Sequence, residues 1–150
     1  MKAVVRIKKL RRGAVMPRYM TAGAAAADIC ACLDTPVTVN PGDRISIPTG
    51  LAIELPADTA GFVYPRSGLA SKNGISLSNC VGVIDSDYRG ELMIALINQS
   101  GNDFEITPGM RIAQLVVAPV LETEFMDAQE EVLSETGRGA GGFGSTGTER

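Results

Sequence analysis

The 150-residue sequence contains no histidine, and this absence restricts the chemistry that the protein can perform. Sites built on Ser-His-Asp or Cys-His nucleophiles are excluded, and so are histidine ligands for metals. Any general base must therefore be a carboxylate or, less commonly, a lysine or tyrosine. Tryptophan is also absent and aromatic residues make up only 5% of the chain, so few rings are available to stack on a base.

Cysteines and long apolar runs are scarce as well. Cys30, Cys32 and Cys80 are odd in number and lack Cys-x-x-Cys spacing, which indicates neither a disulfide framework nor a zinc site, and we expect small buried side chains. No apolar run approaches the roughly 20 residues of a membrane span, and the N-terminus lacks the order of a signal peptide. The sequence therefore predicts a soluble, cytoplasmic, single-domain protein with no membrane partner.

No acidic residue precedes Asp28, whereas seven of the fourteen basic residues do, in a chain whose net charge is −3. Such a basic arm could bind nucleic acid. The alternative, which we favour, is a solvated strand and turn, because Val5, Ile7 and Leu10 are interleaved with the charges and aromatic residues are few. We therefore expect no nucleic-acid partner. The basic residues are Lys2, Arg6, Lys8, Lys9, Arg11, Arg12 and Arg18.

Alternating apolar residues predict short strands along the chain. Apolar side chains recur at every second position in residues 37–39, 45–47 and 51–55. Turn residues punctuate the chain at 40–42, 48–50, 56 and 108–109. Short helical turns are expected only at 67–72 and 127–134. This pattern predicts a helix-poor, all-β fold, an antiparallel β-sandwich or jelly roll, with residues 1–20 and 136–150 as arms outside the core.

Residues 91–97 depart from this alternation, because every position after Glu91 is apolar. Both faces of such a strand are expected to be covered. The second cover would be another copy of the chain, which favours an oligomer, or a second sheet of the same chain.

A β-hairpin with a polar tip is predicted for residues 79–91. Asp85 and Asp87 are two positions apart, and on a continuing strand they would share a face, where repulsion could tune one carboxylate as a base or metal ligand. Aspartate is also common in turns for conformational reasons alone.

A second candidate lies in residues 64–70, where Arg66, Ser67 and Gly68 follow a predicted strand end. If a helix starts there, its first N–H groups could bind an anion. The alternative is an ordinary strand-to-helix turn with an exposed arginine.

The third candidate is the glycine-rich stretch Arg138–Gly147. Glycines let backbone N–H groups curl around an anion, Arg138 offers a bidentate fork for phosphate, and the hydroxyls of Ser145 and Thr146 add donors. Phe143 is a large apolar ring in a polar loop and could close over a base. The alternative is a flexible glycine-rich tail. The stretch is not a Walker A loop, because no Gly-Lys-Ser/Thr follows the glycines.

Together these segments resemble the trimeric dUTPases (dUTP diphosphatases) from end to end. The five matching segments are Gly23–Ile29, Pro65–Ala70, Asn79–Glu91, Arg111–Leu115 and the glycine-rich stretch. The resemblance implies a jelly-roll homotrimer with three active sites, each shared by the subunits. The body would span residues 1–135, and the arm 136–150 would close over a site formed by the other chains. It also implies hydrolysis of dUTP to dUMP and pyrophosphate, which limits uracil in DNA and supplies dUMP for thymidylate synthesis.

The resemblance assigns roles within the hairpin. Asp85 would orient and deprotonate the water that attacks the α-phosphorus and would also contact the sugar 3′-OH. Tyr88 would lie under the deoxyribose and leave no space for a 2′-OH. Asn79 and the hairpin backbone would hydrogen-bond the uracil edge, so that cytosine and thymine are rejected. Further substrate contacts are expected from Gly82, Val83 and Met93.

The remaining segments would handle the phosphates and Mg²⁺, which the triphosphate itself mainly holds. Arg66, Ser67 and Gly68 would bind phosphate, and Gln114 would touch the α-phosphate region. Asp28 would meet a magnesium-bound water, in keeping with the few protein ligands that this ion needs.

The arm would complete the site. Arg138, Gly144, Ser145 and Thr146 would bind the γ-phosphate end, and Phe143 would stack on uracil. Arg111 is expected to pair with a buried carboxylate, and Asp87 to stabilise the hairpin turn.

The departures from the family pattern are Ala26 and Ala27, where the family usually has glycine and a larger apolar residue. Two rivals remain open. A dCTP deaminase shares the fold but works with a catalytic glutamate at the hairpin, where this chain has Asp-Tyr-Arg-Gly. A non-catalytic trimeric module would be expected to lack Asp85 or the tail, and both are present.

Overall fold

The structure is a computed structural model that describes residues 3–129, 133–145 and 147. Ten strands and one short helix lie in these residues. The strands are β1 (Arg6–Lys9), β2 (Ala27–Cys30), β3 (Val37–Val39), β4 (Arg44–Glu54), β5 (Thr59–Pro65), β6 (Ile75–Leu77), β7 (Gly82–Ile84), β8 (Glu91–Asn98), β9 (Phe104–Ile106) and β10 (Arg111–Pro119). The helix is α1 (Ser67–Asn73).

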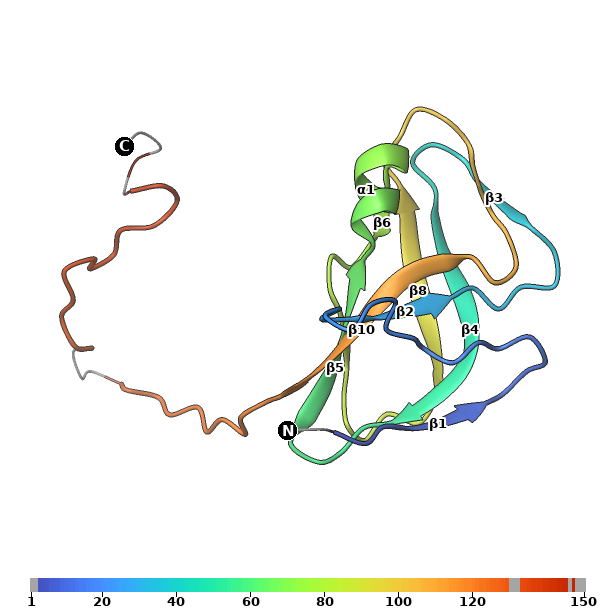
Figure 1. Cartoon of the computed structure of the whole chain (residues 1–150). Coiled ribbons are helices and arrows are strands. Elements are labelled where there is room, and N and C mark those ends of the chain that lie inside the picture. The colour runs from blue at the N-terminus through green and yellow to red at the C-terminus, as the bar shows by residue number, and fades with distance from the viewer. Residues whose placement is uncertain (1–2, 130–132, 146, 148–150) are drawn as a thin grey trace.

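Two antiparallel sheets of four strands form the body (Figure 1). Their strand orders are β1-β4-β8-β6 and β2-β10-β5-β7, and β3 pairs with β9 beside them. The core lies between the sheets, where β4 and β8 supply Ile47 and Ile94, and the facing sheet supplies Ile29 and Ile112, each at most 1% exposed. The predicted all-β fold is confirmed, and the sheets do not close into a barrel.

The N-terminal segment belongs to the body, so the expected arm at residues 1–20 is wrong for most of its length. β1 pairs with β4 in the register Ile7 to Ile53, Ala14 is buried, and Arg18 bridges to Asp28. The basic segment is therefore an edge strand and a turn, the reading favoured from the sequence.

Residues 48–50 form no turn, contrary to expectation, because β4 runs through them as one strand with a register shift between Pro48 and Ala52. Gly50 has φ 68°, and a Cβ there would lie 2.8 Å from the Ala14 Cβ. The buried Thr49 hydroxyl donates to the Leu92 carbonyl at 2.7 Å. Glycine and threonine together therefore make a bulge that stays tied to β8.

The predicted helical turn at 67–72 is confirmed by α1, which ends at Gly74 with φ 67° and a hydrogen bond from its N–H to the Ala70 carbonyl. The second expected turn, at 127–134, is not found. Residues 127–129 and 133–134 are not helical, and 130–132 lie outside the described residues. No helix in the described part of the chain is long and apolar enough to cross a membrane.

β8 has one covered face in the single chain. Leu92, Ile94 and Leu96 point into the core, whereas Met93 is 43% exposed and Ala95 and Ile97 are partly exposed. A second sheet of the same chain therefore does not cover the outer face, and the alternative cover, a second copy of the chain, stays a prediction.

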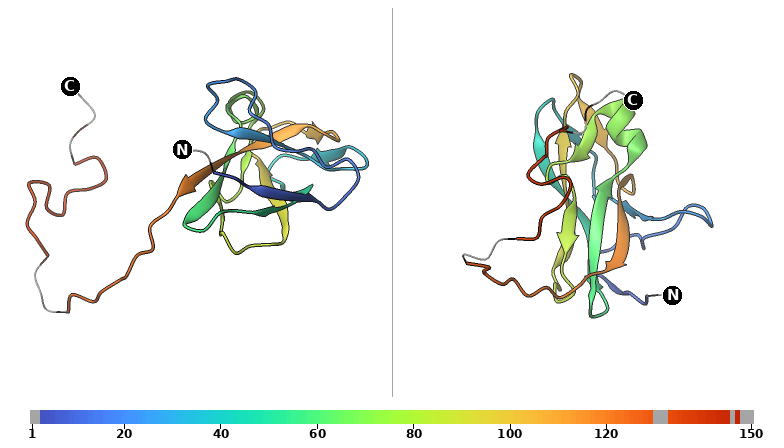
Figure 2. Two further views of the ribbon diagram at one scale, coloured as in Figure 1. Left: turned by 60° about the horizontal axis from the view of Figure 1, so that its bottom comes forward. Right: turned by 90° about the vertical axis from the view of Figure 1, so that its left-hand side faces the viewer.

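After β10 the chain leaves the body (Figure 1 and the left view of Figure 2). Leu121, Phe125 and Met126 are each more than 80% exposed along this extension. The glycine-rich stretch therefore lies away from both sheets.

Candidate functional site

The prediction of a β-hairpin at 79–91 is wrong in its pairing, because β7 belongs to the sheet β2-β10-β5-β7 and β8 to the sheet β1-β4-β8-β6. The polar turn between β7 and β8 therefore joins the two sheets, and we keep the word hairpin for residues 79–91. The Tyr88 N–H donates to the Asp85 carbonyl at 3.2 Å, and the Arg89 guanidinium donates to the carbonyl of Ser86 at 2.7 Å. β7 ends at Ile84, so the strand does not continue to Asp85 and Asp87 as their shared-face interpretation required. Asp85 faces the pocket described next, and Asp87 does not line it.

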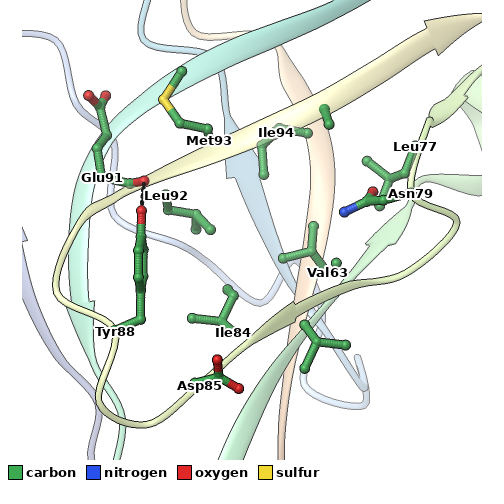
Figure 3. Close-up of a pocket in the computed structure, with 13 residues that line it drawn as sticks. Val63, Leu77, Asn79, Ile84, Asp85, Tyr88, Glu91, Leu92, Met93 and Ile94 are labelled. Atoms are coloured by element: carbon green, nitrogen blue, oxygen red, sulfur yellow. Dashed lines mark hydrogen bonds between the residues drawn. The ribbon is translucent and has the colours of Figure 1, made fainter.

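A pocket of about 220 Å³ opens between this hairpin and β8 (Figure 3), and we call it the hairpin pocket. It brings together the residues of the body that were predicted to bind the nucleoside, namely Asn79, Gly82, Val83, Asp85, Tyr88 and Met93, but not Phe143 of the arm. Its other walls are Val63, Leu77, Ile84, Glu91, Leu92, Ile94 and Ala95. The pocket is thus apolar at its base, with an amide, a carboxylate and a phenol around it.

Two glycines make room for its polar side chains. The Tyr88 hydroxyl donates to the Glu91 carbonyl at 2.9 Å, and a Cβ at Gly90 would lie 2.6 Å from the Tyr88 Cζ. A Cβ at Gly82 would lie 3.2 Å from the Val63 Cβ and 3.4 Å from the Asn79 amide nitrogen. Side chains at either position would displace the groups that shape the pocket.

A second pocket, the arginine pocket, lies where β2 and β10 meet the start of α1. It brings together the predicted phosphate-binding residues Arg66, Ser67, Gly68 and Gln114 with Asp28 and Arg111. Met20, Ala24, Ala25, Ala26, Tyr64 and Val116 complete its lining.

Asp28 is the charge at the centre of the arginine pocket. Its Oδ2 accepts from Arg111 at 3.0 Å and lies 3.4 Å from the Arg66 guanidinium, and its side chain is only 11% exposed. Arg66 also donates to the Arg111 carbonyl at 3.1 Å. The expected pairing of Arg111 with a buried carboxylate is therefore present. One carboxylate faces two guanidinium groups, so the pocket carries a net positive charge suited to an anion.

The cysteines differ in environment. Cys32 is buried and Cys30 partly buried, but Cys80 is exposed with φ 62°, so the expectation of burial is wrong for Cys80. Burial raises the pKa of the Cys30 thiol and the nearby Asp28 carboxylate adds to this, although Arg111 and Arg66 oppose it.

The two pockets lie on opposite faces of one sheet. Val63 lines the hairpin pocket, while its neighbour Tyr64 lines the arginine pocket. Successive strand residues point to opposite faces, and Tyr64 is paired with Gln114, which in turn is paired with Asp28, on the arginine-pocket face. One small ligand therefore cannot touch both pockets of the same chain.

The glycine-rich stretch lines neither pocket. Phe143 is fully exposed with φ 49°, and backbone turns join Arg138 to Gly141 and Gly142 to Ser145. Gly144 also has a positive φ, and Thr146 lies outside the described residues.

Met20, Tyr64 and Glu91 are among the pocket-lining residues that received no role from the sequence. Tyr64 carried a usable signal, because strand alternation places it on one face with Arg66. Met20 carried none, since its position depends on the loop that precedes β2.

Known proteins are similar to this chain over most of its length. The dUTPase family model matches residues 12–147. The deoxyuridine 5'-triphosphate nucleotidohydrolase of Desulfitobacterium hafniense is 57% identical over 133 residues, covering 88% of this chain and 87% of that protein. The protein of the same name from Burkholderia mallei is 50% identical over 149 residues, covering 98% and 99%. The Staphylococcus bacteriophage 80alpha dUTPase with dUPNHPP shares the fold with a TM-score of 0.87 at 28% identity, covering 97% of this chain and 99% of that chain.

These matches define the protein as a nucleotide hydrolase with an all-β fold. The family model spans most of the chain, and both bacterial relatives align with nearly nine-tenths of it or more. The chain belongs to the dUTPase family.

Proposed function

We propose that this dUTPase converts dUTP to dUMP and pyrophosphate by attack of water on the α-phosphorus, which limits uracil in DNA and supplies dUMP for thymidylate synthesis. The observation that carries the proposal is the hairpin pocket, where Asp85, Tyr88 and Asn79 surround one apolar cavity. At about 220 Å³ it is smaller than the roughly 300–1,000 Å³ of pockets for drug-sized ligands, so it suits a nucleoside rather than a whole triphosphate.

In this proposal Asp85 is the general base. Its carboxylate accepts a proton from the attacking water as the water oxygen bonds to the α-phosphorus. The bond from that phosphorus to the bridging oxygen breaks, and pyrophosphate leaves. Asp85 lies at the polar rim of the pocket, where the sugar and the α-phosphate of a nucleotide with a buried base would sit. No histidine competes for the role.

Tyr88 and Asn79 set the selectivity. The Tyr88 ring, held against Gly90, would pack under the deoxyribose and exclude a 2′-OH. The Asn79 amide points into the pocket (Figure 3) and would pair with the uracil edge, with Gly82, Val83 and Met93 around the base. Cytosine presents a donor where uracil presents an acceptor, so its binding would leave a buried polar group unpaired. The pocket would therefore bind cytosine more weakly than uracil.

The arginine pocket supplies the phosphate contacts. Arg66, with the hydroxyl of Ser67 and the open backbone at Gly68, would bind phosphate oxygens, and Gln114 would approach the α-phosphate region. The arm would close over the bound nucleotide. The γ-phosphate would be bound by Arg138, Gly144, Ser145 and Thr146, and Phe143 would stack on uracil. The exposure of Phe143 supports this role, because nothing in the body of the chain packs against the ring.

The residues of the arginine pocket fit Mg²⁺ bound through the substrate. The described residues contain no group of three or more acidic or cysteine side chains that could hold a metal ion by themselves. Magnesium retains waters and prefers oxygen ligands, which a triphosphate supplies, and when bound it would offset the charge of the phosphates. Asp28, whose Oδ2 pairs with both arginines, would accept a hydrogen bond from a metal-bound water.

We further propose that the active enzyme is a cytoplasmic homotrimer. Because the two pockets lie on opposite faces of a sheet, a complete site needs the hairpin pocket of one chain beside the arginine pocket of another. A second copy would also cover the partly exposed apolar face of β8. Residues 1–135 would form the shared body and 136–150 the closing arm.

The test is a product assay with Mg²⁺ and, separately, dUTP, dCTP, dTTP and UTP. We expect dUMP and pyrophosphate from dUTP alone, and Asp85→Asn should bind dUTP but lower kcat by a factor of about 10² or more. Ammonia from dCTP would place the protein among the deaminases. Absence of any turnover would favour a binding module, and normal turnover by Asp85→Asn would remove Asp85 from the role of base.

A further inference from the structure

The structure draws attention to Glu91, the first residue of β8. β8 pairs with two residues of β4, Pro48 and Ala52, and the bulge residues between these two lie outside the ladder. The Gly50 N–H in this bulge donates instead to the Glu91 carboxylate, Oε1, at 2.8 Å. The side chain of Glu91 thus replaces a backbone acceptor at the point where the sheet is irregular.

The second oxygen of the same carboxylate reaches the N-terminal segment. Oε2 accepts from the Arg11 guanidinium at 3.0 Å, and the Leu10 N–H donates to the Gly50 carbonyl at 2.7 Å. The Glu91 side chain is only 20% exposed, so its charge is partly shielded from water. Glu91 therefore fastens three segments together: the turn after β1, the bulge of β4 and the start of β8.

The main chain of Glu91 faces the other way, into the hairpin. Its carbonyl accepts the Tyr88 hydroxyl at 2.9 Å, as the dashed line in Figure 3 shows. Tyr88 is 44% exposed, so packing alone does not hold its ring. The neighbouring Gly90 leaves the space that the ring occupies.

We propose that Glu91 is a positioning residue that sets the selectivity for a deoxyribose over a ribose, by fixing the carbonyl to which Tyr88 is bonded. This inference rests on the proposed function, in which the Tyr88 ring excludes a 2′-OH. With Glu91 fastened to Gly50 and Arg11, the carbonyl and the phenol stay in place and the ring cannot retreat from a larger sugar. With the carboxylate removed, the bulge of β4 and the turn after β1 lose the acceptor that they share, the start of β8 is no longer fastened to them, and the Tyr88 ring gains room to move.

The experiment measures kcat and KM for dUTP and UTP in Glu91→Ala, Glu91→Gln and a matched control, Glu54→Ala. Glu54 also pairs with an arginine on the same sheet, Arg6 at 3.1 Å, so its ion pair is to β1 and not to the hairpin. We expect Glu91→Ala to lower the ratio of kcat/KM for dUTP over UTP by about tenfold, the effect of losing one hydrogen bond to a charged group. The change should lie mainly in KM for dUTP and in a gain of UTP turnover.

The other variants rank the contacts. Glu91→Gln should have a smaller effect, because its amide oxygen still accepts the Gly50 N–H. Glu54→Ala should leave the ratio unchanged. Tyr88→Phe should lower the ratio by a similar factor, and adding Glu91→Ala to it should change little further, because both act through one hydrogen bond.

The results separate this inference from the proposed function. If the wild-type protein does not hydrolyse dUTP, the proposed function fails. If the wild type hydrolyses dUTP while Glu91→Ala and Glu91→Gln lose melting temperature but keep the wild-type ratio, Glu91 has a structural role only and the inference is overturned. If Glu91→Ala does not fold, Arg11→Met takes its place, because the Arg11 side chain is half exposed. Arg11→Met should shift the ratio in the same direction, and an unchanged ratio would contradict the inference.

Discussion

At the scale of single residues, Asp28 has two tasks in the arginine pocket. It holds Arg66 and Arg111 beside each other, and it lowers the positive charge of a pocket that is built for an anion. Two guanidinium groups at one carboxylate oxygen would repel each other without it. Arg111 has a structural role here, because it is also paired with Cys30 across the β2–β10 ladder.

Asp28→Asn tests this arrangement, because it keeps the shape of the side chain and removes the charge. We expect the free energy of unfolding to fall by about 1–2 kcal/mol, less than for a fully buried pair because both arginines are partly exposed. Urea denaturation at one fixed chain concentration would measure it. Asp34→Asn, at an exposed loop position, is the control and should have no effect. Equal stability of the two variants would show that the arginines do not depend on Asp28.

At the scale of elements, the hairpin depends on glycine for reasons of space. Gly90 does not have a positive φ, so alanine at this position meets no left-handed backbone strain, but its Cβ would overlap the Tyr88 ring. We expect Gly90→Ala to displace the ring, raise KM for dUTP about tenfold or more and change the melting temperature little. Steady-state kinetics together with thermal unfolding would separate these effects.

Gly101→Ala is the matched control. A Cβ at Gly101 would meet nothing within 4 Å, and its φ is likewise not positive. If both this variant and Gly90→Ala had wild-type kinetics, the position of the Tyr88 ring would not matter for substrate binding.

The resemblance to the dUTPases assigned most of the polar residues of both pockets. Sequence alone could predict most strands, because alternation depends on neighbouring residues. It could not predict the bulge at 48–50, since proline and glycine there resemble a turn and only pairing with β8 keeps the strand continuous. The pairing of β1 with β4 could not be predicted either, because the charges of β1 are compatible with an arm and its partner is distant in sequence. The exposure of Cys80 depends on a local φ of 62°, which composition does not reveal.

At the scale of the whole molecule, the sheet β2-β10-β5-β7 separates the two halves of the proposed site. Val63 and Tyr64 are adjacent in sequence, yet each belongs to a different pocket. The wall between the pockets is therefore one sheet thick, and the distance from nucleoside to phosphate cannot be spanned within a chain. The extended arm packs on neither half, and in the proposed trimer it would reach the site of a third chain.

Subunit mixing tests this sharing. Asp85→Asn chains keep an intact arginine pocket, and Arg66→Met chains keep an intact hairpin pocket, so each should be inactive alone. If sites are shared, refolding the two together in equal amounts should restore about a quarter of wild-type activity, because half of the hairpins and half of the arginine pockets are intact and they combine at random.

Mixing folded trimers without refolding is the control and should restore nothing until chains exchange. A chain truncated after Glu135, used in place of Arg66→Met, extends the test to the arm. Recovery with both partners would establish that the hairpin comes from a different chain than the phosphate contacts and from a different chain than the arm. No recovery in a mixture shown by native mass spectrometry to contain mixed trimers would mean that each chain works alone, and the two pockets would then need a different explanation.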